Sequence, residues 1–266
     1  MATPRTVVFF HAHPDDESIA TGGTMAKLAA DGHRVVLVVA TRGEHGEVAE
    51  GFLRPGEALW ERRVEETQAS AEILGVARVA FLGYVDSGMV GTPENDAPES
   101  FWQADVDEAA ARLAAILDEE GADVVTAYDE NGMYGHPDHV QVHRVGLAAA
   151  RLAATPKAYM STLNRDHFRR GIAAARAAGV TLPDDAPPED FTMGVGEERI
   201  TTTVDVRGVV GVKRRSMAAH ASQISETSFF LSMPDDAFLN GFGSEWYMLD
   251  GAPPGTAETD LLDGLA

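Results

Sequence analysis

Cysteine is absent from the 266-residue sequence, and this absence restricts the chemistry available to the protein. Disulfide bonds are excluded, and a metal site would have to consist of histidine, carboxylate and water ligands. No run of about 18 consecutive apolar residues occurs, so we expect no membrane-spanning helix. The N-terminus leads almost at once into a strand-like run without a signal-peptide pattern, which predicts a cytoplasmic location.

Positive charge is scarce, because 21 lysine and arginine residues stand against 42 aspartate and glutamate residues, giving a net charge of -21. Binding a phosphate backbone requires a basic surface, so we expect no nucleic-acid partner. The length and the hydrophobic content of 44% suit one large domain with a sizeable core. We expect a single domain over 1–266, with a core over 1–163 and a C-terminal lobe and tail over 164–266. A homo-oligomer is left open.

Strand-like and helix-like patterns alternate along the chain. We expect strands at 6–12, 34–40, 78–84, 123–129, 157–162 and 200–206, and helices at about 17–31, 57–74, 105–120, 137–154, 168–178 and 208–223. This alternation predicts an α/β fold of the Rossmann-like, doubly wound type, with a mostly parallel sheet and a C-terminal lobe over the site. The polar segments 86–104 and 180–198 are expected to be loops, and the tail from Gly251 is expected to be frayed.

Two clusters of histidine and carboxylate residues follow strand-like runs that are far apart in the sequence. The first is His13-Pro14-Asp15-Asp16-Glu17, after an apolar run at 7–10, and the second is His136-Pro137-Asp138-His139, after the run at 123–129. Parallel strands present their carboxyl ends at one edge of a sheet, where α/β proteins build their sites. We therefore expect the two clusters to meet. The alternative is that both are polar turns that cap helices.

The residue types in these clusters are those of a catalytic zinc site, in which two histidines and a carboxylate leave one position open. We assign His13, Asp16 and His139 as ligands of one zinc ion per chain, although Fe²⁺ binds similar residue sets. Asp15 is then expected to act as the general base that activates a water molecule.

Two further residues of the second cluster are expected to assist. His136 would act as the general acid or as the cation that stabilises the oxyanion. Asp138 would hydrogen-bond a ring nitrogen of His136 and tune its pKa. Elsewhere, His220 lies in a predicted helix that could close over the site.

The paired motifs Ala12-His13-Pro14-Asp15-Asp16-Glu17 and Gly135-His136-Pro137-Asp138-His139 resemble the LmbE/PIG-L family of zinc-dependent N-deacetylases. Segments 85–89 and 128–134 resemble the mycothiol-pathway branch of that family. This branch includes the deacetylase acting on N-acetylglucosaminyl-inositol and the mycothiol S-conjugate amidase. The resemblance extends over roughly residues 5–163.

The resemblance implies the same ligands and the same roles for Asp15 and His136. It adds Tyr134 as a partner of the oxyanion or carbonyl, and Arg63 and Asp86 as contacts to sugar or inositol hydroxyls. The expected function is hydrolytic removal of an N-acetyl group from a small-molecule substrate that contains an amino sugar, of the N-acetylglucosamine type.

Two alternatives remain open. The nearer is an amidase that cleaves a larger acyl group, such as a mycothiol S-conjugate, or a deacetylase that tailors a secondary metabolite. Segments 86–104 and 180–198 are expected to wall the substrate pocket and would decide between these. The more distant alternative is a non-catalytic Rossmann-type protein that binds a sugar or nucleotide. The missing glycine fingerprint counts against it.

Overall fold

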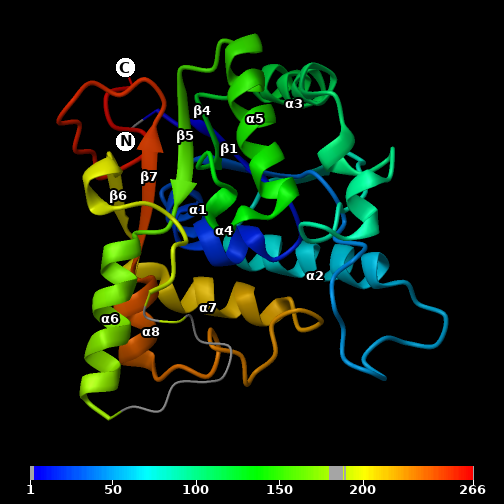
Figure 1. Cartoon of the computed structure of the whole chain (residues 1–266). Helices are drawn as coiled ribbons and strands as arrows, with labels where there is room; N and C mark the ends of the chain where they lie inside the picture. Colours follow the sequence, from blue (N-terminus) through cyan, green and yellow to red (C-terminus); the bar gives the residue numbers. More distant parts are fainter. Residues whose placement is uncertain (1–2, 180–187, 189, 266) are drawn as a thin grey trace.

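The computed structural model describes residues 3–179, 188 and 190–265, which build a seven-stranded sheet flanked by helices (Figure 1). The strands are β1 (Thr6–His11), β2 (Arg34–Val39), β3 (Arg78–Phe81), β4 (Val124–Tyr128), β5 (Lys157–Thr162), β6 (Thr202–Asp205) and β7 (Ser244–Leu249). The α-helices are α1 (Gly22–Ala30), α2 (Leu59–Leu74), α3 (Val106–Glu120), α4 (Gly132–Gly135), α5 (Pro137–Leu152), α6 (Arg165–Ala177), α7 (Val210–Ala219) and α8 (Asp235–Phe242). A π-helical turn, Glu17–Thr21, leads into α1.

The strand order in the sheet is β3-β2-β1-β4-β5-β7-β6. Strands β1 to β5 pair in parallel, whereas β7 is antiparallel to both β5 and β6. The central strands β1, β2 and β4 are buried along almost their whole length, as their continuous apolar runs require. The predicted Rossmann-like, doubly wound and mostly parallel sheet is therefore confirmed.

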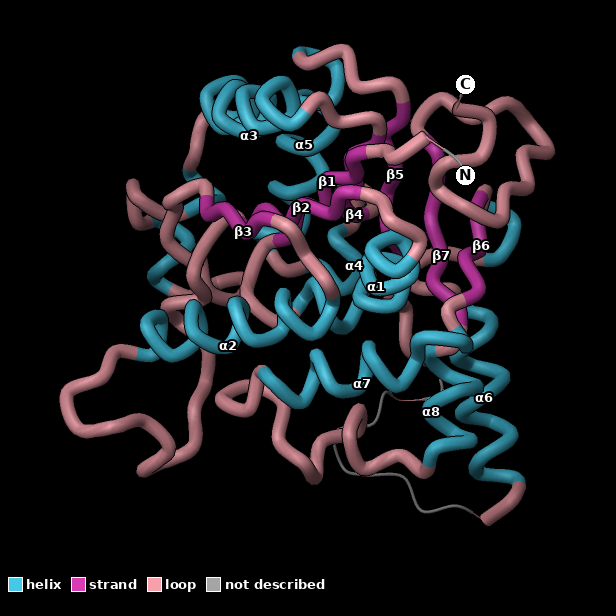
Figure 2. The backbone as a smooth tube through the Cα atoms, turned by 180° about the vertical axis from the view of Figure 1, so that it is seen from behind, coloured by secondary structure: helices cyan, strands magenta, loops and turns pink. Residues whose placement is uncertain are grey.

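Each face of the sheet has its own core, because successive strand residues point to opposite faces. Val8 and Phe10 of β1 belong to a cluster covered by α3 and α5, whereas Val7 and Phe9 belong to a second cluster to which α1 and α2 contribute. Figure 2 shows α3 and α5 on one side of the sheet and α1 and α2 on the other. Within the described ranges, no helix is both long and apolar enough to cross a membrane.

The direction of winding reverses between β1 and β4. From β1 the chain moves outward through β2 to β3, then crosses to the other side of β1 to form β4 and β5. The carboxyl ends of β1 and β4 therefore flank the topological switch point, where open α/β sheets form their ligand crevices. The two histidine and carboxylate clusters follow these two strands, so the fold brings them together.

The chain after residue 163 adds strands to the sheet and helices beyond its carboxyl edge. Figure 1 shows α6, α7 and α8 grouped beyond the end of β5. Helix α8 and strand β7 were not predicted from the sequence. The pairing of β7 depends on β5 and β6, which are far away in the sequence, so no local pattern marks it.

The C-terminal tail is anchored to the sheet. Leu261 is fully buried in the core. Glu258 accepts hydrogen bonds from Lys157 Nζ at 2.7 Å and from the Tyr159 hydroxyl at 2.6 Å. The expectation of a frayed tail from Gly251 is therefore wrong, because these long-range contacts hold a segment whose composition alone suggested a loose end.

Candidate active site

The loop after β1 and the first turn of α5 bring His13, Asp16 and His139 together. Asp16 Oδ2 lies 3.4 Å from His13 Nδ1 and 3.3 Å from His139 Nε2. The three ligand atoms all lie within 4.8 Å of one another. The two clusters therefore meet as expected.

The spacing of these three atoms fits a shared metal ion better than direct hydrogen bonds. Hydrogen bonds of this type are usually about 2.9 Å long. Ligands on a tetrahedral ion with metal–ligand bonds of about 2.05 Å lie about 3.3 Å apart. The residues present therefore fit a divalent metal with nitrogen and oxygen ligands.

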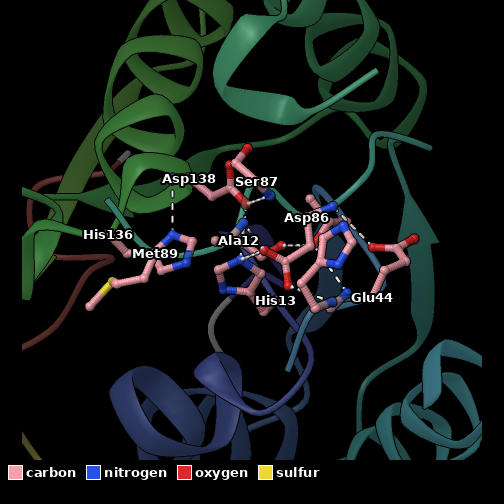
Figure 3. Close-up of polar contacts among 12 residues, drawn as sticks. Ala12, His13, Glu44, Asp86, Ser87, Met89, His136 and Asp138 are labelled. Atoms are coloured by element: carbon pink, nitrogen blue, oxygen red, sulfur yellow. Dashed lines mark hydrogen bonds and ion pairs between the residues drawn. The ribbon is translucent and has the colours of Figure 1, made fainter. Parts of the chain in front are cut away.

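Asp138 orients His13 and does not contact the His136 ring through its carboxylate. Its Oδ2 atom lies 3.0 Å from His13 Nε2 and accepts a hydrogen bond from Ser87 N at 2.9 Å. The Ser87 hydroxyl donates to the other carboxylate oxygen (Figure 3). A carboxylate that holds the second ring nitrogen of a ligand histidine fixes its tautomer and orientation. The expected contact with His136 is made only by the backbone N of Asp138, at 3.1 Å from Nδ1.

The carboxylates around His13 favour a positive charge at the position proposed for the metal. Burial alone would lower the pKa of His13, but Asp86, Asp138 and Asp16 together raise it well above its ordinary value. Burial would raise the pKa of Asp16, but the neighbouring His139 and His13 lower it well below its ordinary value. An ionised carboxylate within a field that stabilises cations is the electrostatic environment that a metal ion needs.

Asp15 stands beside the ligand group in a strained backbone conformation. Its φ of 96° is unusual for a residue with a side chain. Its backbone N donates to Glu17 Oε2 at 3.0 Å, and its carboxylate Oδ2 lies 3.3 Å from Arg63 Nη2. Burial raises the pKa of Asp15 to about 6, although Arg63 opposes this effect. Such strain is often found at functional sites, where the surrounding contacts maintain it.

A fully buried group of polar side chains supports the loop that carries Asp15. Glu17 Oε1 accepts a hydrogen bond from Ser70 Oγ at 2.6 Å and lies 2.6 Å from His220 Nε2. His220 therefore acts through Glu17 and does not reach the ligand group itself. Ser70 belongs to α2 and His220 follows α7, so three distant segments converge on Glu17.

The surroundings of His136 disfavour its charged form. Its Nδ1 accepts from the Asp138 backbone N, which leaves the proton on Nε2. Burial, together with His13 and His139, lowers the pKa of His136 to about 4. A cationic His136 is therefore disfavoured at neutral pH.

Tyr134 lies on a strained turn between β4 and α5. Its hydroxyl oxygen is 3.2 Å from His139 Nε2, and its side chain is 44% exposed. The preceding Met133 has a φ of 61° and a ψ of -64°, and its backbone N donates to Asp129 Oδ1 at 3.0 Å. A Cβ at Gly132 would stand 2.6 Å from the His139 Cβ, so only glycine allows this turn to approach α5 so closely.

The two residues expected to bind sugar hydroxyls are buried and already bonded. Arg63 donates from Nη1 to the Gly43 carbonyl at 2.9 Å and from Nη2 to the Pro14 carbonyl at 2.6 Å. Asp86 accepts from the backbone N of His45 at 3.2 Å and of Gly88 at 2.9 Å. Both stand near the ligand group, but neither lines the adjoining cavity. Their assignment as substrate contacts remains a prediction.

A cavity of about 460 Å³ opens onto the ligand group. Asp15, Asp16, Tyr134 and His139 line it next to the ligand group, and further lining residues come from the π-helical turn, β5, α6, α7, α8, β7 and the loops between them. No residue of segment 86–104 contributes to it. Phe191 and Met193 of segment 180–198 do, whereas 180–187 and 189 lie outside the described residues. No local pattern predicts this cavity, because its aromatic lining comes from separate segments.

Comparison with known proteins gives one consistent result. Residues 8–150 match the family described as PIG-L: GlcNAc-PI de-N-acetylase. A protein of Thermomonospora curvata named 1D-myo-inositol 2-acetamido-2-deoxy-alpha-D-glucopyranoside deacetylase is 40% identical, over 99% of this chain and 98% of its own length. A protein of the same name from Acidothermus cellulolyticus is 41% identical, over 98% of this chain and 95% of its own.

Solved structures share the fold. The N,N'-diacetylchitobiose deacetylase of Pyrococcus horikoshii has a TM-score of 0.59 at 22% identity and covers 94% of this chain and 84% of its own. The 4-carboxy-2-hydroxymuconate hydratase GalB of Pseudomonas putida has a TM-score of 0.55 at 19% identity and covers 94% and 97%. The fold thus hosts more than one reaction. On the sequence matches, this chain belongs to the PIG-L (LmbE) family of de-N-acetylases.

Proposed function

We propose that the protein is a zinc-dependent hydrolase that removes the N-acetyl group from an amino-sugar conjugate such as N-acetylglucosaminyl-inositol. The observation that carries this proposal is the position of Asp15, a buried carboxylate with a raised pKa, beside the His13, Asp16 and His139 group. The names of the relatives support the substrate class, because they specify an acetamido sugar joined to inositol.

Zinc is the metal we propose, because two imidazoles, one carboxylate and an open position are a usual catalytic zinc set. Ferrous iron binds similar sets, so metal analysis of the purified protein must distinguish the two. When bound, the ion would supply a Lewis acid for the amide carbonyl and would make a water molecule more acidic.

Asp15 carries out both proton transfers in the proposed reaction. Asp15 takes a proton from the attacking water, for which its pKa of about 6 is well suited near neutral pH. The water oxygen forms a bond to the amide carbon, and the carbonyl oxygen gains negative charge. Protonated Asp15 gives the proton to the departing nitrogen as the C–N bond breaks, which releases acetate and the free amine.

Two donors would stabilise the developing negative charge in this proposal. Tyr134 lines the cavity with its hydroxyl near His139, and desolvation of that hydroxyl together with the neighbouring Asp16 raises the pKa of Tyr134, so this hydroxyl stays protonated. The neutral His136 carries its proton on Nε2, as its hydrogen bond at Nδ1 requires. Preorganised donors of this kind are among the largest contributions to amide hydrolysis. We therefore assign His136 to oxyanion binding and not to acid catalysis.

The test is acetate release from N-acetylglucosaminyl-inositol by the zinc-loaded protein. We expect release that requires the metal and that falls by at least about 10³-fold in Asp15→Ala while zinc stays bound. The metal-stripped protein and the exposed Asp107→Ala variant are the controls. Near-native release by Asp15→Ala would refute the assigned base, and no release by the loaded wild type would refute the substrate class.

A further inference from the structure

The lining of the cavity beside the ligand group has two chemically different parts. Asp15, Asp16, Tyr134 and His139 line it next to the proposed metal site. Most of the remaining wall is apolar, and its aromatic part consists of Phe168, Phe191, Phe229, Phe230, Phe242 and Trp246. A volume of about 460 Å³ lies within the range of small-molecule sites, and an acetyl group would fill only a small part of it.

The aromatic wall is a continuous cluster. Phe168 packs on Phe242 and Trp246 with ring centroids 5.8 and 5.9 Å apart, and Phe230 packs on Phe242 at 5.8 Å. These rings come from α6, the loop after α7, α8 and β7. Such a wall offers a large apolar surface to a ligand and few partners to water.

Polar side chains of the same wall already form hydrogen bonds within the protein. Lys213 Nζ donates to Glu245 Oε1 at 2.5 Å, and both side chains are only 2% exposed. Thr162 Oγ1 donates to Asp129 Oδ2 at 2.6 Å. Gln223 Nε2 donates to the Glu47 carbonyl at 3.0 Å. A sugar ring in this cavity would therefore find few free partners for its hydroxyls.

Two further carboxylates, Asp86 and Glu44, make the other side of His13 polar. His13 Nδ1 faces Asp16, whereas Nε2 lies 3.5 Å from Asp86 Oδ1. Glu44 accepts a hydrogen bond from Asp86 N at 3.0 Å on this second side (Figure 3). Neither Glu44 nor Asp86 lines the cavity. A bound amide would thus have a polar region on one side of the metal group and an apolar region on the other.

We infer that the cavity holds an apolar acyl chain of the substrate, so that the enzyme cleaves long-chain N-acyl amino sugars more efficiently than N-acetyl ones. This inference rests on the proposed amide hydrolysis and specifies its substrate class. The sugar takes the polar side, and the carbonyl is presented to Asp15. The chain beyond the carbonyl carbon then enters the cavity, whose lining includes Ile19, Leu163 and the aromatic cluster.

The size of the effect follows from apolar burial. Each methylene that the cavity removes from water is expected to raise kcat/KM by up to about fourfold. An N-hexanoyl substrate should therefore exceed its N-acetyl counterpart by at least about tenfold. The gain should level off when the chain fills the cavity.

Two matched substrate series test this assignment on the zinc-loaded protein. The first varies the acyl group of a methyl glucosaminide from acetyl through butanoyl and hexanoyl to octanoyl. The second keeps the N-acetyl group and varies the aglycone from methyl to octyl. We expect kcat/KM for amine release to rise along the first series only. A rise along the second series alone, or a fall along the first, overturns the inference.

Phe230→Ser places a hydroxyl in the aromatic wall, and Leu231→Ser is its matched control. Both residues are half-buried in one loop and pack on one apolar cluster, but only Phe230 lines the cavity. We expect Phe230→Ser to lower the hexanoyl-to-acetyl ratio of kcat/KM by about tenfold and Leu231→Ser to preserve it. Equal ratios in the two variants overturn the inference.

Direct binding separates this inference from the proposed function. Calorimetry on the wild type should show that octanoate binds at least about tenfold more tightly than acetate. If acetate is released from N-acetylglucosaminyl-inositol but octanoate has no advantage over acetate, the acyl-chain inference alone fails. If octanoate binds tightly and longer amides are cleaved without any acetyl hydrolysis, the acetyl substrate alone is wrong.

Discussion

Asp138 and His13, 125 positions apart in the sequence, meet with Oδ2 3.0 Å from Nε2. Because Asp138 is fully buried and Ser87 bonds both of its oxygens, its carboxylate has a fixed position. With a metal ion bound, the contact would hold the proton of His13 on Nε2 and leave Nδ1, which faces Asp16, free to bind the ion. The second motif therefore helps to position a proposed metal ligand of the first.

Removing this carboxylate should weaken metal binding more than it harms the fold around it. We expect Asp138→Ala to lower zinc affinity by about 10- to 100-fold, which is typical when the carboxylate partner of a ligand histidine is removed. Competition with a chelator measures the affinity, and circular dichroism checks the fold. Asp107→Ala, on the exposed surface of α3, should bind zinc like the wild type. Wild-type zinc affinity in Asp138→Ala would contradict the orienting role.

Glu17 holds Asp15 in its strained conformation, since Glu17 Oε2 accepts the hydrogen bond from Asp15 N. We expect Glu17→Ala to lower kcat by at least about tenfold, as misplaced catalytic groups do, while KM and zinc content change little. Stability should fall by about 3–5 kcal/mol, because His220 loses its buried partner. Steady-state kinetics, zinc analysis and urea unfolding test the three parts.

Glu17→Gln and the exposed Glu72→Ala are the matched comparisons. The glutamine retains an acceptor for Asp15 N, so it should recover part of the lost kcat. Glu72 is exposed on α2, and its substitution should change neither kcat nor stability. A kcat in Glu17→Ala equal to that of Glu72→Ala would refute the positioning role.

The ion pair between Glu17 and His220 should make stability depend on pH in a defined direction. Burial alone would lower the pKa of His220, but Glu17 outweighs this effect and raises it above the ordinary value of 6.5. A raised folded-state pKa gives stabilisation that is complete below the unfolded value and is lost as pH rises through the folded value. The stability difference between the wild type and His220→Gln should therefore be largest near pH 6 and shrink as pH rises.

Urea unfolding at a series of pH values from 6 to 9 measures this difference. His45→Gln, at an exposed position of the loop after β2, is the control. A difference between the wild type and His220→Gln that grows with pH would show that His220 is not stabilised as a cation.

The sequence motifs predicted the centre of the site well because the structure there is local or follows general rules. The apolar runs at 6–12 and 123–129 predicted buried parallel strands, and the carboxyl ends of such strands meet at a switch point. The expected meeting of His13, Asp16 and His139 depended only on these two facts. The spacing of three within each motif then fixed which residues of each turn would face inward.

The supporting contacts could not be predicted in the same way. Ser70 and His220 reach Glu17 from α2 and from beyond α7, and no spacing rule links segments so far apart. The neutral state of His136 follows from burial and from a backbone hydrogen bond that exist only in the folded chain. The aromatic cavity likewise arises from separate segments of the C-terminal lobe, so it is a property of the tertiary structure alone.

Substitution of Arg63 distinguishes two roles for this residue, binding of the sugar and positioning of the loop that carries Asp15. The family resemblance suggests a contact to sugar hydroxyls, but in the structure Arg63 is buried and bridges the Gly43 and Pro14 carbonyls and the Asp15 carboxylate. Lysine would keep the charge but could not form this fork of hydrogen bonds. Arg63→Lys should therefore lower kcat by about tenfold with little change in KM, as loss of an interaction that acts in the transition state does.

The neighbouring Arg62 supplies the control for Arg63. Arg62 of α2 forms an ion pair with Glu57, which precedes the helix, so Arg62→Lys should leave both constants unchanged. If Arg63→Lys instead raises KM while kcat is retained, Arg63 binds the sugar in the ground state. In that case the hydrogen bonds from Arg63 to the Gly43 and Pro14 carbonyls would have to break when substrate enters, and the loop that carries Asp15 would move.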